Sequence, residues 1–235
     1  MKGGSLKVYE VKAFLNASYE PGAPIKLFDY RLDEKLSNLY GKVYVNEKMK
    51  KVVVVHRGTV EAIDWGNNAT YALSSTAYKL TPRFQTAYNM QRQAHKKYSG
   101  YQFETLGHSQ GGLLAHLLGD KSKNTFLFNP ASKSESLRDN EYLIRSTGDV
   151  VSKLSVPKKY MNSILYPNWS KNHYISIPAK SSNPITEHEI NILDRLDQNQ
   201  KIGRGAGRPK NAQSCNCDKK RQLTGYTINV CLSKI

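Results

Sequence analysis

A glycine-rich segment with the sequence G-H-S-Q-G-G occupies residues 107–112, between an apolar run and a helix-forming run. Residues 103–106 have the pattern of a buried strand, and residues 113–118 have that of a helix. When a strand turns into a helix at a single residue, the backbone of that residue is strained, and side chains two positions away would collide. Gly107 and Gly111 avoid this collision. The segment therefore predicts a sharp corner that presents its serine as a nucleophile.

The serine of this corner is Ser109, and its surroundings predict donors for a developing oxyanion. Because Ser109 precedes a helix, the backbone N–H of Gln110 would face the negative charge. A second donor is expected in the loop that leaves the apolar run 51–56. There Gly58 permits close approach of the backbone, and Thr59 offers both an N–H and a hydroxyl. The alternative is a glycine-rich turn with an incidental serine.

Apolar runs alternate with helical segments over the first 200 residues, which predicts an α/β fold of the α/β-hydrolase type. Such alternation is typical of a mostly parallel central sheet with helices on both faces. The expected strands are residues 42–45, 51–56, 103–106, 125–128, 142–147 and 174–177. The clearest helical segments are residues 82–98, 110–118 and 187–196.

A serine nucleophile needs a base, and the base needs an acid that orients it; in this fold the acid precedes the base in the chain. Asp149 follows the expected strand 142–147 almost at once and is the predicted acid. Asp139 competes with it but lies before that strand, among polar residues. A solvated turn is the alternative interpretation of Asp149.

Two histidines downstream of Asp149 are candidates for the base. His173 stands at the beginning of the expected strand 174–177, at the wrong end for the chemistry, and is the alternative base. His188 follows that strand and is preferred. Thr186 and Glu189 match a capping box, which would put His188 in the first turn of the last helix. Either histidine could instead be a surface or packing residue.

Composition and charge divide the chain into three parts. We expect a helix and lead-in over residues 1–40, the catalytic domain over residues 41–200, and a basic, flexible tail over residues 201–235. The net charge is +16, of which the tail supplies +7 and residues 1–200 supply +9. Such a charge favours polyanions, so an anionic membrane surface and nucleic acid are candidate partners. Tyr226 to Val230 could form a strand or a docking segment.

Cysteine usage and hydropathy limit the remaining classes. All three cysteines, Cys215, Cys217 and Cys231, lie in the tail, so no disulfide or cysteine-bound metal is expected in the catalytic domain. We expect no metal and no cofactor. The sequence contains neither a secretory signal nor a long apolar run, which predicts an intracellular or virion-associated protein.

Together these residues resemble the class-three, or fungal-type, lipases. The matching features are Arg57-Gly58-Thr59, Asp64-Trp65, the 107–112 segment, Asp149 and His188. Within that family the resemblance looks closest to compact lipase-like proteins of large DNA viruses and of virophage- or polinton-like elements. It covers about residues 28–196 and implies metal-free hydrolysis of an acyl ester, such as a lipid, through an acyl-enzyme.

A second hypothesis comes from a different class of function. The net charge and the basic tail would also fit a virion-associated or nucleic-acid-binding protein whose hydrolase fold has lost activity. The intact set of serine, acid and base argues against it. Covalent labelling by a fluorophosphonate would separate the two, because only an activated serine reacts.

Removal of the tail gives the first testable prediction. A chain cut after Gln200 is expected to hydrolyse a soluble short-chain ester as the full chain does, but to bind polyanions more weakly. Each Lys or Arg near an anionic surface contributes roughly 1 kcal/mol at modest salt. Binding of both chains to anionic vesicles and to duplex DNA, measured over a salt series, checks the expectation. Equal binding by the shortened chain would contradict it.

Overall fold

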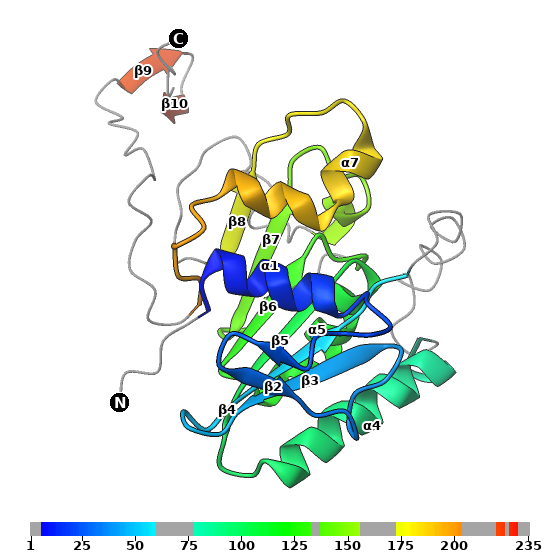
Figure 1. Cartoon of the computed structure of the whole chain (residues 1–235). Helices are drawn as coiled ribbons and strands as arrows, with labels where there is room; N and C mark the ends of the chain where they lie inside the picture. Colours follow the sequence, from blue (N-terminus) through cyan, green and yellow to red (C-terminus); the bar gives the residue numbers. More distant parts are fainter. Residues whose placement is uncertain are drawn as a thin grey trace.

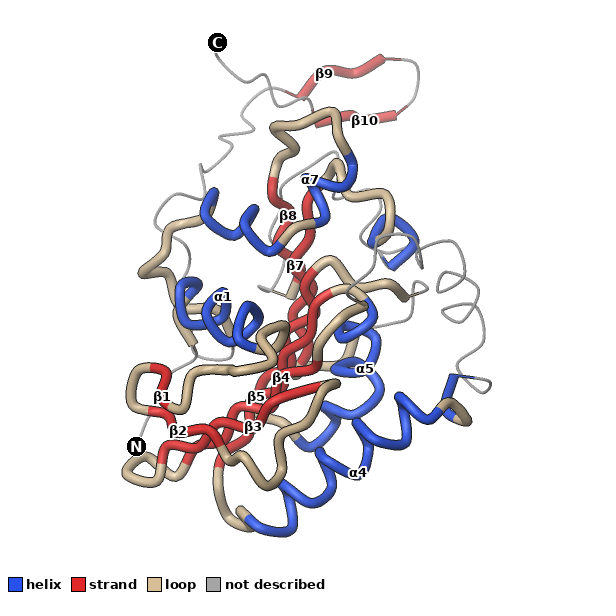
Figure 2. The backbone as a smooth tube through the Cα atoms, turned by 45° about the vertical axis from the view of Figure 1, so that its right-hand side comes forward, coloured by secondary structure: helices blue, strands red, loops and turns tan. Residues whose placement is uncertain are grey.

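The computed structural model describes residues 6–59, 78–132, 137–155, 173–203, 220–223 and 226–229. The expected Asp64-Trp65 pair and most of the tail lie outside these residues. The described part is built on one eight-stranded sheet that runs through the middle of the molecule (Figures 1 and 2).

The strands of this sheet are neighbours in the same order as in the sequence. They are β1 (Lys26–Leu27), β2 (Tyr30–Leu32), β3 (Gly41–Asn46), β4 (Lys51–His56), β5 (Gln102–His108), β6 (Asn124–Phe128), β7 (Glu141–Ser146) and β8 (Tyr174–Ile177). β1 to β4 pair antiparallel, and β4 to β8 pair parallel. The predicted mostly parallel sheet is confirmed. The sheet begins earlier than expected, because β1 and β2 fall within the predicted lead-in.

Helices cover both faces of the sheet, as predicted. α1 (Val8–Ala17) and the 3-10 helix η5 (Ile190–Arg195) lie on one face, and α4 (Pro82–Lys97) and α5 (Gln110–Leu118) lie on the other (Figure 2). The shorter elements are η2 (Gly119–Lys121), η3 (Ser152–Ser155) and α7 (Pro184–His188). The single helix predicted over residues 187–196 is wrong. It is interrupted at Glu189, whose φ of −66° and ψ of 152° are extended.

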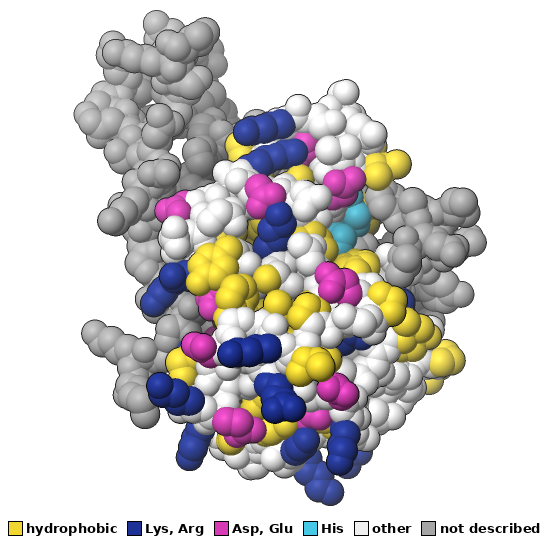
Figure 3. All heavy atoms as spheres, in the orientation of Figure 1, with side chains coloured by type: hydrophobic (Ala, Val, Ile, Leu, Met, Phe, Trp, Pro, Cys, Tyr) yellow, Lys and Arg dark blue, Asp and Glu magenta, His cyan; other side chains and the backbone are white. Residues whose placement is uncertain are grey.

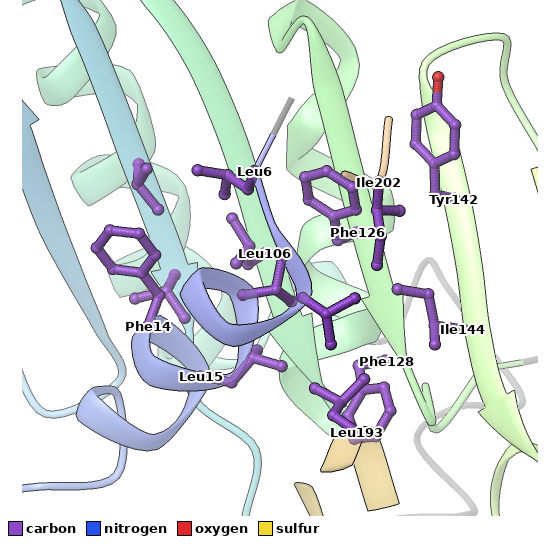
Figure 4. Close-up of a cluster of buried hydrophobic side chains, with 14 of the residues drawn as sticks. Leu6, Phe14, Leu15, Leu106, Phe126, Phe128, Tyr142, Ile144, Leu193 and Ile202 are labelled. Carbon is purple, nitrogen blue, oxygen red and sulfur yellow. The ribbon is translucent and has the colours of Figure 1, made fainter. Parts of the chain in front are cut away.

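The apolar residues of the strands alternate between the two faces of the sheet. Val53 and Val55 of β4 join the core under α1 and η5, whereas Val52 and Val54 join the core under α4. All four valines are fully buried. Figure 4 shows the first of these cores, where side chains from α1 and η5 meet side chains from the strands. Burial on both faces explains why these strands read as nearly continuous apolar runs.

The boundary drawn at residue 200 cuts through packed structure. Ile202 has an exposed fraction of 2%, belongs to the core under α1, and lies beside Phe126 in Figure 4. Its N–H donates to the carbonyl of Leu6 at 2.9 Å. A shortened chain should therefore end after Gly203 rather than after Gln200. Further on, β9 (Lys220–Leu223) and β10 (Tyr226–Asn229) pair antiparallel, so most of the expected segment 226–230 is a strand.

One carboxyl group is buried in β5 and bonds to an amide side chain. Glu104 has an exposed fraction of 1%, and its two carboxyl oxygens accept from Nδ2 of Asn124 at 2.8 and 3.1 Å. Burial raises the pKa of Glu104 from 4.5 to about 8. The pKa of Glu104 is higher in the folded chain than in the unfolded chain. The free energy of unfolding therefore decreases as the pH rises from 4.5 to about 8.

We expect Glu104→Gln to stabilise the protein at pH 8 and to change little at pH 5, because the amide keeps a carbonyl acceptor and never ionises. The gain at pH 8 should be roughly 2–4 kcal/mol. Urea denaturation of wild type and variant at both pH values measures it, with the exposed Glu20→Gln as a matched control. The same pH dependence in wild type and Glu104→Gln would contradict the expectation.

Candidate active site

Ser109 occupies the predicted corner between β5 and α5. β5 ends at His108 and α5 begins at Gln110, so the turn is made at one residue. Ser109 has a φ of 57° and a ψ of −124°, outside the regions that side chains normally allow. Its N–H donates to the carbonyl of Phe128 at 3.1 Å, and its own carbonyl accepts from Gly112 at 2.9 Å. The corner is thus fixed by β6 and by the helix.

The glycines of this region allow three backbones to meet. A methyl group added at Gly107 would overlap the carbonyl of Gly111, and one added at Gly111 would overlap the carbonyl of His56 at the end of β4. At Gly58, which follows β4, an added methyl group would lie 3.0 Å from Cβ of Ser109. The exit of β4 therefore passes directly beside the corner.

The predicted acid and base meet. Nδ1 of His188 lies 3.0 Å from Oδ1 of Asp149, and both side chains are buried. Asp149 also accepts from the N–H of Val151 at 2.9 Å and of Ser152 at 3.2 Å, which fixes its carboxylate. Since the carboxylate can only accept, Nδ1 of His188 carries the proton and Nε2 is the basic nitrogen of the ring.

His188 reaches this place by a local structure other than the predicted one. It is the last residue of α7 and not in the first turn of a helix, and the cap is Asn183, whose side chain accepts from the N–H of Ile185. The capping box of Thr186 and Glu189 is therefore wrong. Asn183 takes the cap because Pro184, at the first position of α7, fits a helix start.

The carbonyl of His188 is held by two side chains at the carboxyl ends of β5 and β6. It accepts from Nε2 of His108 at 2.8 Å and from Nδ2 of Asn129 at 3.1 Å. The rings of His108 and His188 lie 4.8 Å apart between centroids. Since His108 directly precedes Ser109, this contact brings the base to the same edge of the sheet as the corner.

The two competing candidates lie elsewhere. Nδ1 of His173 bonds to the carbonyl of Glu141, the first residue of β7. This contact lies at the amino ends of the parallel strands, whereas Ser109 lies at their carboxyl ends. Asp139 is exposed in the turn that precedes β7. Neither approaches the pair of Asp149 and His188 in any contact of the described residues.

The loop after β4 is held by a tyrosine that the sequence did not single out. The N–H of Gly58 donates to the hydroxyl oxygen of Tyr19 at 3.0 Å, and the same hydroxyl lies 2.7 Å from Nδ1 of His108. Gly58 thus uses its N–H internally, and Thr59 is the next residue that can offer one. Gln110 is buried at the first position of α5, where a helix supplies no acceptor for the N–H.

Within the described residues, no group of three or more His, Cys, Asp or Glu side chains could hold a metal ion. No helix in this part of the chain is long and apolar enough to cross a membrane.

The sequence over residues 8–137 matches the family described as "Phospholipase-like: Tle-like phospholipase domain". This match spans more than half of the chain and includes the corner at Ser109. The chain belongs to this phospholipase-like family. It is an ester hydrolase of the lipase type, and its mostly parallel sheet with helices on both faces agrees with the predicted α/β fold. The predicted lipase resemblance is confirmed at this level.

Solved structures of fungal lipases resemble this phospholipase-like protein at low identity. Lip2 lipase from Yarrowia lipolytica is 16% identical, with a TM-score of 0.42 over 63% of this chain and 72% of the other. A triacylglycerol lipase from Penicillium expansum is 20% identical, with a TM-score of 0.36 over 52% and 59%. Mono- and diacylglycerol lipase from Aspergillus oryzae is 16% identical, with a TM-score of 0.38 over 63% and 73%. No curated protein matches the sequence.

The segment that carries His188 in this phospholipase-like protein is organised around one buried carboxylate. Glu187 accepts from both nitrogens of Arg195 at 2.7 and 3.0 Å, from the N–H groups of Lys180 and Ser181, and from the hydroxyl of Ser146. The Arg195 guanidinium, with the other donors, lowers the pKa of Glu187 to about 2. Through Ser146, the carboxylate ties Glu187, which directly precedes the candidate base, to the end of β7.

Like Tyr19 and Asn129, Glu187 escaped prediction because a sequence shows no contacts between distant residues. Its partners Ser146 and Ser181 are ordinary polar residues in the sequence. Arg195 has the opposite charge, but it stands eight positions away, a separation that does not by itself predict an ion pair. A single acidic residue beside a candidate histidine is too common to single out.

We expect Glu187→Gln to destabilise the protein by about 3 kcal/mol at neutral pH, because Arg195 loses its buried partner. The carboxylate has a lowered pKa, so its contribution is present above pH 4.5 and declines as the pH falls toward 2. Thermal unfolding at neutral pH and near pH 3 measures the difference. The neighbouring Glu189→Gln, at an exposed position, is the control, and equal stability of the two variants would contradict the expectation.

Proposed function

We propose that the protein hydrolyses acyl esters of lipids, with Ser109 as nucleophile, His188 as general base and Asp149 as the acid that orients it. The observation that carries the proposal is the buried contact of 3.0 Å between Nδ1 of His188 and Oδ1 of Asp149, beside the strained corner at Ser109. A carboxylate on Nδ1 fixes the ring tautomer that a serine nucleophile requires.

The reaction would proceed through an acyl-enzyme. Oγ of Ser109 attacks the ester carbonyl carbon while Nε2 of His188 takes its proton. The tetrahedral intermediate then collapses, the alcohol leaves with the proton from His188, and the acyl group stays on Ser109. Water attacks this acyl group, gives a proton to His188, and releases the carboxylic acid while Ser109 regains its hydrogen.

The negative charge of the tetrahedral intermediate would be stabilised by backbone donors. The N–H of Gln110 stands at the start of α5, where the helix dipole adds to its effect. Thr59 is the proposed second donor, because the exit of β4 runs beside Ser109. The residue before Thr59 is held by the hydrogen bond from the N–H of Gly58 to Oη of Tyr19, which supports this choice.

Substitution of the three residues tests the proposal. We expect Ser109→Ala to lower the turnover of a p-nitrophenyl ester by about 10⁴-fold or more, and Asp149→Asn and His188→Ala to cripple it as well. His173→Ala and Asp139→Asn, which remove residues far from the pair, are the controls and should retain most activity. An active Ser109→Ala that is folded by circular dichroism would refute the assignment, and a dead His173→Ala with an active His188→Ala would reassign the base.

The chain's partners and location remain proposals of the same kind. A lipid ester is the proposed substrate, and the tail with its charge of +7 is proposed to bind an anionic membrane surface or nucleic acid. On the face drawn in Figure 3, Lys and Arg side chains lie among Asp and Glu side chains, so this face presents mixed charge. The relation to viral lipase-like proteins and the intracellular or virion-associated location stay predictions.

The basic charge favours one second candidate, a binding protein with an inactive hydrolase fold. The fluorophosphonate probe separates the two, because it labels a serine only where a base activates it. Labelling of wild type and its loss in Ser109→Ala support hydrolysis. Absence of labelling together with salt-dependent DNA binding supports the binding protein.

A further inference from the structure

Two side chains, Tyr19 and His108, and two backbone groups, the N–H of Gly58 and the carbonyl of His188, form a continuous hydrogen-bonded network behind the candidate active site. The N–H of Gly58 donates to Oη of Tyr19 at 3.0 Å, and Oη lies 2.7 Å from Nδ1 of His108. Nε2 of His108 lies 2.8 Å from the carbonyl oxygen of His188. One end of this network is thus the loop after β4, and the other end is the backbone of the residue proposed as the base.

The direction of each hydrogen bond follows from the groups at the two ends. A carbonyl can only accept, so Nε2 of His108 carries the ring proton and Nδ1 is an acceptor. The hydroxyl of Tyr19 therefore donates to Nδ1 and accepts from Gly58. Every donor in the chain has one acceptor, so the network has a single arrangement of protons.

This arrangement of protons does not change with pH over the range in which an esterase works. Burial lowers the pKa of His108 to about 3, so its ring stays neutral. Burial also raises the pKa of Tyr19 to about 12, so its hydroxyl keeps its proton. The hydrogen-bonded network therefore has a structural role and does not titrate in this pH range.

The network joins elements that are far apart in the sequence, and its two ends are backbone groups next to the proposed oxyanion donor and in the proposed base. Tyr19 lies two residues after the end of α1 and is 89 positions from His108 and 39 from Gly58. It orients the amide next to Thr59, the proposed oxyanion donor. His108 fixes the main chain of His188 and precedes Ser109. The nucleophile, base and oxyanion loop therefore share one support.

We infer that Tyr19 and His108 are positioning residues, which hold the oxyanion loop and the base in register with Ser109 through a single hydrogen-bonded chain. The inference rests on the proposed function. Because the network touches groups that act on the transition state and not on the bound ester, its loss should lower kcat and leave KM nearly unchanged. A role in packing alone would alter stability without this division.

Tyr19→Phe tests the inference, because it removes one hydroxyl and keeps the ring. We expect kcat for p-nitrophenyl butyrate to fall by about tenfold or more, less than the loss of a direct oxyanion donor, while KM changes by less than about twofold. Tyr44→Phe is the matched control. It also removes a hydroxyl that has one acceptor, the carbonyl of Pro24 at 2.9 Å, but it lies outside the network and should keep the wild-type kcat.

A double-mutant cycle with His108→Phe examines whether the two residues act as one unit. If they do, Tyr19→Phe should lower kcat much less in the His108→Phe background than in wild type. The ¹⁵N chemical shifts of the His108 ring give a readout that is independent of turnover. They should report a neutral ring protonated at Nε2 in wild type and in Tyr44→Phe, with Nδ1 shifted in Tyr19→Phe.

The outcomes distinguish this inference from the proposed function. An active wild type, an inactive Ser109→Ala and a wild-type kcat in Tyr19→Phe would overturn the inference alone. Equal losses of kcat in Tyr19→Phe and Tyr44→Phe, or strictly additive effects in the cycle, would also overturn it. A wild type that neither hydrolyses esters nor reacts with a fluorophosphonate would overturn both.

Discussion

The backbone at Ser109 is the constraint on which the candidate active site depends. Its φ of 57° and ψ of −124° are unfavourable for a residue with a side chain, and such geometry typically costs about 1–3 kcal/mol. The fold holds it by packing the start of α5 onto the exit of β4, an approach that only glycine at position 111 permits. Hydrogen bonds from β6 and α5 to the backbone of Ser109 fix the corner further. The strained backbone at Ser109 is therefore maintained by the packing of α5 against β4 and by these hydrogen bonds.

The elements around this corner are arranged so that polar groups from several strands converge at one edge of the sheet. The ends of β4, β5 and β6 lie in register there, as the pairs of His56 with Gly107 and His108 with Phe128 show. The carboxylate of Asp149 follows β7, and His188 follows β8. Parallel strands bring their carboxyl ends to the same edge, and so place residues distant in sequence within reach of one another.

A second set of buried polar residues supports the catalytic candidates without belonging to them. Asn129 and His108 hold the carbonyl of His188, and Glu187 fixes the chain on the other side of the same residue. Tyr19 extends the support to the loop after β4. Buried groups of this kind are stabilising only when each has its partner, which makes the network intolerant of single changes. Rigid support is what keeps a nucleophile and base in register.

The sequence alone determined the parts of this protein that depend on local patterns. The corner at residues 107–112, the central strands, and the α/β class follow from glycine spacing and apolar periodicity. The order of acid and base follows from the fold class. The choice of Asp149 and His188 over Asp139 and His173 also came from the sequence, through their positions after strands. The tertiary structure brings the preferred acid and base together and leaves their catalytic roles as a proposal.

Tertiary structure decided what depends on contacts between distant residues. The two early strands are too short to read from periodicity, and Ile202 belongs to the core only because it meets the residues around α1. The capping box at Thr186 failed because Asn183 and Pro184 offer a competing helix start, and a sequence cannot weigh the two without the packing around them. Tyr19 carries no signal of its own. Its hydroxyl gains meaning only where folding sets it between Gly58 and His108, because a hydrogen bond is defined by position and not by residue type.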